Sequence, residues 1–567
     1  MKRIIATILL GALAFEAGAQ GWEDALAYSE NDYLGTARSV GMGNAMTAVG
    51  GDLGSLTFNP AGSAVAGYSQ FTITPGLSVS SVFGQGTYLD GAPFGFEDGV
   101  KTRSPRFQIP NFGAVMVYDT RNRSGLKRVT FGLVGNMTRD YNNKLRATGT
   151  NGVTTLAASL ASQADGYPES AFTYDNLDIP WEVTVGYKAG LFNPVPGREG
   201  SYLGLTERLR DDGRMELADD IGQYYGLTRS GNKYDLLMNF GLDFNDRFYV
   251  GANIGITTLD YHYDEVRSEE ALSGRNYPSG FESIRSHSTY HDEGSGIYAK
   301  VGFIARPFDG FRIGAAIQTP TYFDIRETYQ HEGRSIAKRE EMRESSPEDE
   351  WLYRLRAPFR ANVGVAYTIA KMALLSADYE YTDYSGMKFA PAYDDYANFD
   401  FSAQNRDIKD FTGPVHALRL GAEIKPSPEL ALRVGYNVTT GAQYRKLSYD
   451  SYEGALLPLG SQYEREVGAV QTLTAQERKD QLRTAVSFGI GYSSPGSFFA
   501  DFAIRFQYLP YENFTPYYYY GYWSDYNGGQ KYADGSDPMC IMRNDVTPEI
   551  GSQSALCNAL LTLGWRF

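Results

Sequence analysis

The chain has 567 residues, of which 42% are hydrophobic and only 21% charged, and its 43 Tyr, 31 Phe and 62 Gly favour many strands and turns over helical domains. Its net charge of −15 disfavours a general nucleic-acid binder, because phosphate binding needs a basic face. Two cysteines exclude a disulfide-dense scaffold and a cysteine-based zinc module, and no apolar stretch reaches the roughly 18 residues of a spanning helix.

The N-terminus has the features of an export signal. Lys2 and Arg3 precede a short apolar run over residues 4–15, and Ala17-Gly18-Ala19 fits the small-residue cleavage rule. We therefore expect residues 1–19 to be a signal peptide and the mature chain to begin at Gln20. In an exported protein Cys540 and Cys557 could pair as a disulfide.

Residues 20–66 form a segment of a different kind, rich in Gly and Ala and without alternation. At about 47 residues with few bulky apolar side chains, it can hardly bury a core of its own. We expect it to fold against another part of the protein. Gly41-Met42-Gly43 superficially suggests a phosphate loop, but it lacks the third glycine and a preceding strand, so we assign no nucleotide or other cofactor.

The rest of the chain alternates with a period of two residues. In FYVGANIGIT (248–257) Phe, Val, Ala and two Ile share one face, while small and polar residues share the other. Fourteen such segments are joined alternately by very short turns, such as Asn245-Asp246 and Asp309-Gly310, and by long connections. We predict strands near residues 67–83, 106–120, 127–141, 222–244, 247–264, 294–308, 311–331, 351–369, 372–387, 412–425, 429–445, 481–494, 498–512 and 551–567.

This rhythm predicts an all-β fold, a 14-stranded antiparallel transmembrane β-barrel over residues 67–567 with tight turns on the periplasmic side and long extracellular loops, notably 142–221 and 513–550. The last strand ends in Phe567, the form associated with recognition by the barrel-assembly machinery. With the export signal, it predicts an integral protein of the Gram-negative outer membrane that contacts lipid and lipopolysaccharide.

The segment Gly35 to Gly62 resembles the N-terminal hatch of the FadL-like family of outer-membrane transporters for long-chain fatty acids and other hydrophobic compounds, in the form of its Bacteroidetes-type members. The residues that carry the resemblance are GTARS (35–39), Gly41, Gly43, Ala45, Ala48, Asp52 and Asn59-Pro60-Ala61-Gly62. The resemblance implies a monomeric barrel whose lumen is plugged by the hatch (20–66), with Asn59, Pro60 and Ala61 near the ligand path. It also implies passive uptake of fatty acids or aromatic hydrocarbons, although a related branch serves protein secretion.

The long loop 142–221 offers apolar residues that could capture such a ligand. Leu156 and Leu160 have helical spacing after Thr154 or Thr155 as N-cap, and Trp181, Tyr187 and Phe192 follow. These residues either line a capture site or pack the loop on itself.

Arg360, Arg433 and Arg505 fall on the non-lipid parity of their strands, where a charge avoids a cost of roughly 2–4 kcal/mol at mid-bilayer. They either pair with lumenal acids such as Glu380, Glu423 and Asp501 or bind the carboxylate of a ligand. If they bind ligand, Arg433→Ala should weaken fatty-acid uptake and spare neutral hydrocarbons.

Other chemistry is sparse. His287 and His291 are four residues apart and could share a metal on a helix, but we interpret this segment as an outside loop and assign no metal site. We predict a transporter of hydrophobic compounds and not an enzyme. The alternatives are a protein-secretion shuttle or interaction scaffold and a general polar porin.

Overall fold

The structure, a computed structural model, describes residues 21–86, 88–89, 92–93, 95–210, 215–370, 372–392, 400–447, 470–517 and 548–567. The predicted signal peptide lies outside these residues. So does Cys540, the predicted partner of Cys557, which itself lies in the last strand.

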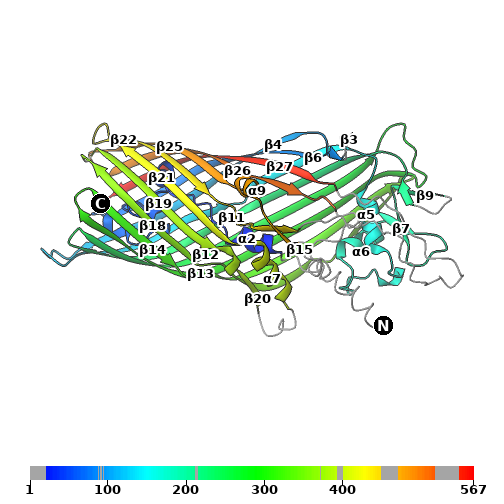
Figure 1. The fold of residues 1–567 in the computed structure, drawn as a ribbon, viewed down its shortest axis with the longest axis horizontal. Helices are drawn as coiled ribbons and strands as arrows, with labels where there is room; N and C mark the ends of the chain where they lie inside the picture. Colours follow the sequence, from blue (N-terminus) through cyan, green and yellow to red (C-terminus); the bar gives the residue numbers. More distant parts are fainter. Residues whose placement is uncertain are drawn as a thin grey trace.

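The described chain forms one closed antiparallel barrel, and the predicted 14-stranded fold is confirmed. The first strand pairs with the last, Gln70 opposite Arg566 and Ile73 opposite Leu563, which closes the wall without a free edge (Figure 1). The wall consists of β1 (Gln70–Gly86), β4 (Val100–Asp119), β5 (Leu126–Asp140) with β6 (Asn143–Asn151), β11 (Ile221–Phe244), β12 (Phe248–Ala271), β13 (Phe281–Phe308), β14 (Phe311–Gln318) with β15 (Tyr322–Ala337), β17 (Asp349–Arg356) with β18 (Arg360–Ile369), β19 (Ala373–Asp383) with β20 (Lys388–Pro391), β21 (Pro414–Ile424), β22 (Leu430–Thr439), β25 (Arg483–Ser493), β26 (Phe498–Phe514) and β27 (Ile550–Arg566).

The two ends of the barrel differ. At the end where the chain terminates, which we call the turn end, neighbouring strands are joined by short turns, and Asn245 and Asp246 take the positive φ values (60° and 55°) of a tight hairpin. The opposite end carries the long connections and is called the loop end (Figure 1).

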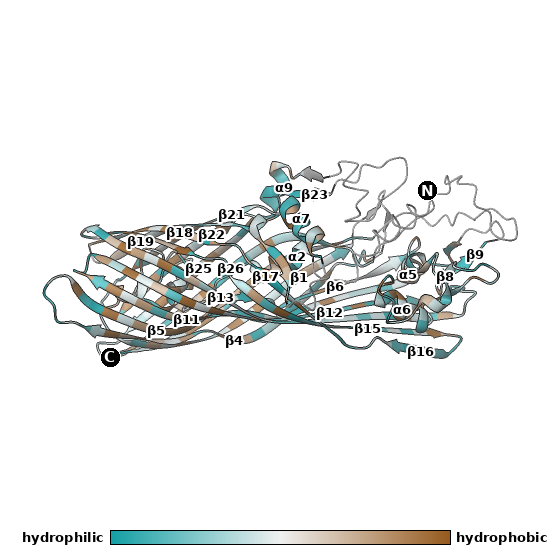
Figure 2. Ribbon diagram, turned by 90° about the horizontal axis from the view of Figure 1, so that it is seen from below, coloured by the Kyte–Doolittle hydropathy of each residue, from teal (hydrophilic) through white to brown (hydrophobic). Residues whose placement is uncertain are grey.

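The outer surface of the barrel near the turn end is apolar, and hydrophobic positions alternate along the strands of this part of the wall (Figure 2). Ile254 and Ile256 of β12, Ile297 and Val301 of β13 and Val363 of β18 are large hydrophobic side chains exposed on it. Aromatic residues such as Trp565 flank them. A band of this kind around a closed barrel is the surface that meets lipid.

Several strands continue beyond this band toward the loop end. β11 and β12 have 24 residues each and β13 has 28, whereas roughly 9–11 residues cross a bilayer. The prediction of an outside loop around His287 and His291 is therefore wrong, because both lie in β13. The strands extend there without an apolar face, so the sequence shows no apolar alternation.

The predicted loop 142–221 is likewise only partly a loop. β6 extends the wall, and the following residues form a small unit at the loop end, built from the elements α5 (Leu156–Ala164), η2 (Glu169–Ala171), α6 (Trp181–Lys188), β7 (Phe192–Pro194), β8 (Tyr202–Gly204), β9 (Glu207–Leu209) and β10 (Met215–Leu217). The smaller elements elsewhere are β2 (Tyr88–Leu89), β3 (Ala92–Pro93), β16 (Glu340–Ser345), η3 (Tyr384–Gly386), α7 (Ser402–Phe411), β23 (Arg445–Leu447), β24 (Val470–Thr472) and α9 (Ala475–Asp480).

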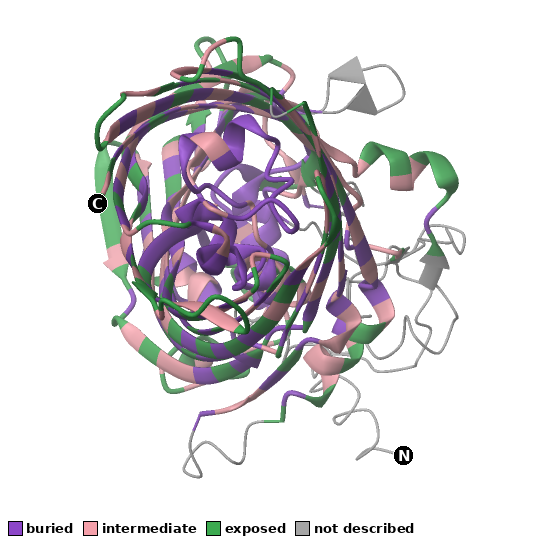
Figure 3. Ribbon diagram, turned by 90° about the vertical axis from the view of Figure 1, so that its left-hand side faces the viewer, coloured by how far each residue is buried: buried purple, intermediate pink, exposed green. Residues whose placement is uncertain are grey.

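The N-terminal segment 21–66, which we call the hatch, lies inside the barrel. Seen along the bore, its buried turns fill the interior of the wall (Figure 3). It contains α2 (Trp22–Ser29), α3 (Ala37–Gly41), η1 (Leu53–Thr57) and α4 (Gly62–Val65). Within the described residues, no helix has both the length and the apolarity needed to cross a membrane.

Candidate functional site

The hatch owes its local shape to side-chain caps that the sequence encodes. The Thr36 hydroxyl accepts from the backbone N–H of Ser39 and starts α3, and Asp52 caps η1 by accepting from Gly54 N at 2.9 Å. The Thr36 hydroxyl also donates to Asp52 at 2.6 Å, so the two caps hold each other. These caps therefore shape the hatch through bonds of its own, independent of its contacts with the wall.

Asn59 and Pro60 attach the hatch to two strands of the wall, β13 and β11, and Ala61 completes a turn within the hatch. The fully buried Asn59 amide donates to the carbonyls of Thr47 (2.8 Å) and Phe303 (2.9 Å), and its oxygen accepts from Ala61 N. The Pro60 carbonyl accepts from Asn239 of β11 at 2.9 Å. Residues that the sequence placed in the hatch therefore bond directly to the barrel wall.

Glycines on the inner face of the wall let the hatch backbone approach closely. A Cβ at Gly251 would lie 2.3 Å from the Pro60 carbonyl carbon, and one at Gly302 would lie 2.3 Å from Asn59 Oδ1. On the other side of the bore, Gly43 has a φ of +62°, and a Cβ there would lie 2.8 Å from Leu420 O. A Cβ at Gly41 would lie 3.3 Å from the Cα of Gly489 in β25. Hatch and wall fit each other backbone to backbone.

A buried chain of charges joins the hatch to the wall near the turn end. Arg38 Nε of α3 lies 3.1 Å from Glu423 Oε2 of β21, and the same oxygen lies 2.6 Å from Arg433 Nε of β22. Arg433 also donates to Asp501 of β26 at 2.5 Å. Arg433, which we predicted either to pair or to bind ligand, thus pairs with two carboxylates of the wall.

A second set of charges joins the wall to the hatch residues that follow α2. Glu30 pairs with Arg139 of β5 at 3.3 Å and with Arg483 of β25, and Asp32 pairs with Arg505 of β26. These contacts join residues up to 473 positions apart. Arg505 therefore finds its partner on the hatch and not on the wall.

Arg360 belongs to a third buried group. Glu380 of β19 accepts from Arg360 at 3.4 Å and from Arg419 at 3.0 Å, and Arg360 also donates to the Ser29 carbonyl of the hatch. Buried pairs of this type are costly to break, because the remaining charge stays in a dry environment. All three predicted arginines point inward and bond to the hatch, to lumenal acids or to both.

An aromatic cluster covers the hatch on the loop-end side. Tyr28 of α2 packs edge-on against Tyr261 of β12, with ring centroids 5.8 Å apart, and its hydroxyl donates to Asp292 at 2.7 Å. Buried side chains extend this cluster across the bore toward α7. The members are Tyr141, Phe323, Tyr353, Phe389, Phe401 and Ile408, with Trp22 half-buried at its edge.

The small unit at the loop end packs largely on itself. Leu156, Leu160 and Phe192 are at most 2% exposed and belong to one core with the extended wall. Tyr187 stacks on Phe172 at 4.5 Å, and Trp181 Nε1 donates to the Tyr174 carbonyl at 3.1 Å. In this conformation the leucines support the unit from within and are not part of an open surface.

An ion pair ties this unit to the wall. Glu182 of α6 lies 2.5 Å from Arg267 of β12 and accepts from Ser286 of β13. Burial by itself would raise the pKa of the Glu182 carboxyl, but the guanidinium of Arg267 holds that pKa below its usual value. The unit is therefore fixed to the wall by a charge that persists at neutral pH.

Beneath the hatch, a cavity of about 450 Å³ lies at the turn end. Charged side chains from both the hatch and the wall line it, including Arg38, Asp52, Arg312, Glu423, Lys425, Arg433 and Asp501. The space on the turn-end side of the hatch is therefore polar.

Four anchoring residues escaped the sequence analysis. Lys233 donates to the carbonyls of Tyr28 and Glu30 at 2.6 Å, and Lys300 donates to Thr57 O at 2.5 Å. Asn239 and Asn253 bond to each other and to Pro60 and Leu56. All four lie at inward-facing positions of β11, β12 or β13. The alternation of apolar and polar residues in these strands would therefore have predicted that they face the lumen.

The comparisons with known proteins find likeness only among solved structures. No family model matches the chain, and no curated protein matches it. A crystal structure of a Pseudomonas aeruginosa FadL homologue aligns over 94% of this chain and 99% of its own, at 12% identity and a TM-score of 0.48. The Pseudomonas putida toluene transporter TodX aligns over 95% and 100% at 11% identity and a TM-score of 0.44, and the CymD monoaromatic hydrocarbon channel over 93% and 96% at 9% and 0.41. Likeness at this level does not by itself establish a common family.

Proposed function

We propose that this protein is a FadL-like outer-membrane channel for the passive uptake of hydrophobic compounds, such as long-chain fatty acids or aromatic hydrocarbons. In this proposal the turn end faces the periplasm and the loop end faces outward. The observation that carries it is the combination of a lipid-facing barrel with a bore filled by the chain's own hatch.

The filled bore favours this function over a general polar porin. A porin needs a continuous water-filled path, whereas here the hatch backbone contacts wall glycines on opposite sides of the bore. Passage through such a barrel requires that a ligand first binds and that the plug or wall then rearranges. Binding must be favourable enough for capture and weak enough for release.

The aromatic cluster above the hatch is the place where we propose capture. It combines the rings of Tyr353, Phe389 and Phe401, whose centroids lie 5.6–6.5 Å apart, with the half-buried Trp22. The three rings are at most 4% exposed, so a ligand would enter by parting them from the side of Trp22. Aromatic faces bury apolar ligands without demanding a particular head group. Trp181 and Tyr187, the half-buried rings of the loop-end unit, would guide ligands toward this cluster, whereas Phe192 is buried inside the unit.

The pairing of the lumenal arginines favours a channel that recognises the apolar part of a ligand and not its carboxylate. Arg360, Arg433 and Arg505 are already bonded to carboxylates, so a ligand carboxylate would have to displace a protein partner. We therefore expect neutral hydrocarbons and fatty acids to use the same path.

Uptake measured with two radiolabelled probes, oleate and toluene, tests this function in cells that express the protein. Phe389→Ala removes a ring from the cluster and should lower uptake of both probes several-fold. Phe488→Ala, which removes a lipid-exposed ring from β25, is the control for loss of a ring and should leave uptake unchanged. Because Phe389 is only 1% exposed, the heat-dependent gel shift of Phe389→Ala must first show that this variant is folded. If the wild-type protein transports neither probe above background, the proposed function is wrong.

The same assay separates the two roles of Arg433. A structural role predicts that Arg433→Ala changes uptake of oleate and toluene to the same extent. Loss of oleate uptake alone would instead show that Arg433 reads the carboxylate.

A further inference from the structure

Three of the chain's five histidines gather on the outer face of the extended wall, away from the lumen. His262 lies on the outward parity of β12, and His287 and His291 lie on that of β13. On β12 the last large hydrophobic side chain of the lipid-facing band is Ile256, and His262 lies six residues beyond it toward the loop end. The histidines are therefore outside the apolar band and accessible to solvent.

The strand register brings two of these histidines into direct contact. His262 is the cross-strand partner of His291, and Asp260 is that of Glu293. The two imidazole rings stack with centroids 3.9 Å apart and planes inclined by 11°. His287 lies four residues from His291 along β13, toward the loop end, and pairs with Asp264 at 2.9 Å instead.

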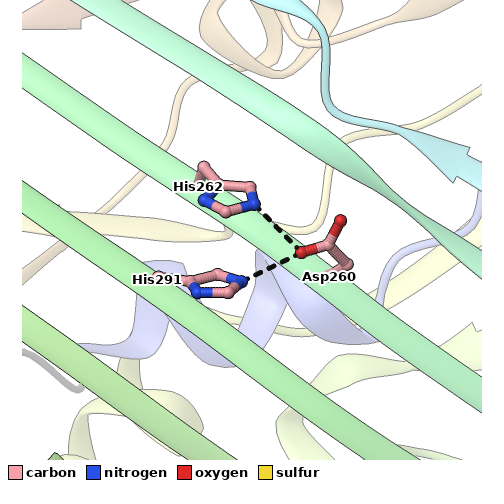
Figure 4. A group of neighbouring side chains, drawn as sticks. All are labelled: Asp260, His262 and His291. Atoms are coloured by element: carbon pink, nitrogen blue, oxygen red, sulfur yellow. Dashed lines mark hydrogen bonds and ion pairs between the residues drawn. The ribbon is translucent and has the colours of Figure 1, made fainter.

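Both stacked rings direct the same ring nitrogen at one carboxylate oxygen. The Nε2 atoms of His262 and His291 lie 3.2 and 3.0 Å from Asp260 Oδ1, as Figure 4 shows. The three possible ligand atoms all lie within 4.8 Å of one another. A fourth oxygen is close, because Glu293 Oε1 lies 3.8 Å from His291 Nε2.

The spacing of these ligand atoms is compatible with a tetrahedral zinc site. With metal–ligand distances of about 2.0–2.2 Å, two ligand atoms on one ion lie about 3.4 Å apart. To seat the ion, the two rings must turn out of their parallel stack so that both Nε2 atoms point at it. The side chains are free to turn, since those of Asp260, His262 and His291 are 46%, 48% and 34% exposed. As ion pairs alone, such exposed contacts are worth roughly 0–1 kcal/mol.

We propose that Asp260, His262 and His291 form a binding site for a divalent cation of the zinc type, with Glu293 or water as the fourth ligand. Two imidazoles and a carboxylate are a donor set suited to Zn²⁺, whereas Ca²⁺ and Mg²⁺ prefer oxygen ligands alone. The bound ion would connect β12 to β13 where the wall is no longer supported by lipid. The proposal does not depend on what the lumen transports.

Isothermal titration of the purified full-length mature barrel in detergent with Zn²⁺, after removal of bound metal by a chelator, tests the site. We expect one high-affinity site, and at least tenfold weaker binding for His262→Ala, His291→Ala and Asp260→Asn. His416→Ala is the matched control, because His416 lies on the outside of β21 and bonds to Tyr379 through Nδ1. Folding of each variant is checked by its heat-dependent shift in gel mobility.

Cobalt gives an independent readout of the ligand set. Co²⁺ in place of Zn²⁺ should show the intense visible absorption of a tetrahedral complex in the wild-type protein and lose it in His291→Ala. The proposal is overturned if the wild-type protein binds no Zn²⁺ at 100-fold molar excess, or if His416→Ala weakens binding as much as His291→Ala does.

Discussion

The Glu423 carboxylate pairs with one arginine of the hatch and one of the wall, and replacing Glu423 should weaken the docking of the hatch. Its carboxylate is 4% exposed and accepts from Arg38 of the hatch at 3.1 Å and from Arg433 of the wall at 2.6 Å. Glu423→Gln keeps the volume and removes the charge. Arg433 retains Asp501 as a partner, but Arg38 loses its carboxylate, so the cost falls on the docking of the hatch.

The magnitude follows from the burial of this pair. Breaking a buried ion pair by removing one partner costs about 3–5 kcal/mol, and because the Arg38 side chain is 22% exposed, this pair belongs at the lower end of that range. Because every 1.4 kcal/mol is a factor of ten, a loss of even 3 kcal/mol raises the undocked fraction of the hatch about 100-fold. We expect Arg38→Gln to have an effect in the same direction, and the double variant to be less affected than the sum of the two, since the residues are in contact.

Ion conductance in planar bilayers measures this opening directly. The wild-type protein should be nearly closed, and Glu423→Gln should show frequent openings. Glu429→Gln is the matched control, because it makes the same charge change at the same end of the barrel, at a side chain that bonds to Ser427 in its own turn. Folded Glu423→Gln barrels that stay as closed as the wild type would refute the reasoning, as would equal opening in Glu429→Gln.

Two further predictions concern packing and capping. Gly43→Ala should destabilise the docked hatch by about 1–3 kcal/mol through overpacking against Leu420 O, in addition to the roughly 1–2 kcal/mol that any L-residue loses at this positive φ. Gly51→Ala is the control for the second cost, because Gly51 has a φ of +71° with open space around it. Equal thermal stability of the two variants would contradict the packing argument. Thr155→Ala removes the hydroxyl that accepts from Ala158 N and bonds to Thr206, so it should lower the stability of α5 by about 1 kcal/mol. Amide hydrogen exchange in α5 should become faster than in the control Thr173→Ala, which changes an exposed threonine. Unchanged exchange rates would argue against the cap.

Alternation in the sequence was sufficient to predict the barrel and the inward direction of its charges. A strand places successive side chains on opposite faces, so the parity of Arg360, Arg433 and Arg505 follows from the neighbouring apolar residues alone. The short turns were equally visible, since Asn245-Asp246 carries the residue types that accept positive φ. The limits of this signal appear where the wall leaves the lipid and β13 continues without an apolar face.

The partners of these residues were decided only by the tertiary structure. Nothing local to Arg505 indicates that its carboxylate is Asp32 of the hatch, because the pairing depends on how deep the hatch sits in the bore. His262 and His291 belong to different strands, and a shift of one residue in their register would turn one of them into the lumen. The sequence by itself determined which face of the wall each side chain occupies, because that depends on a two-residue period. Which residues meet across the bore or between strands was fixed by register and docking, which arise only when the barrel closes around its own N-terminal segment.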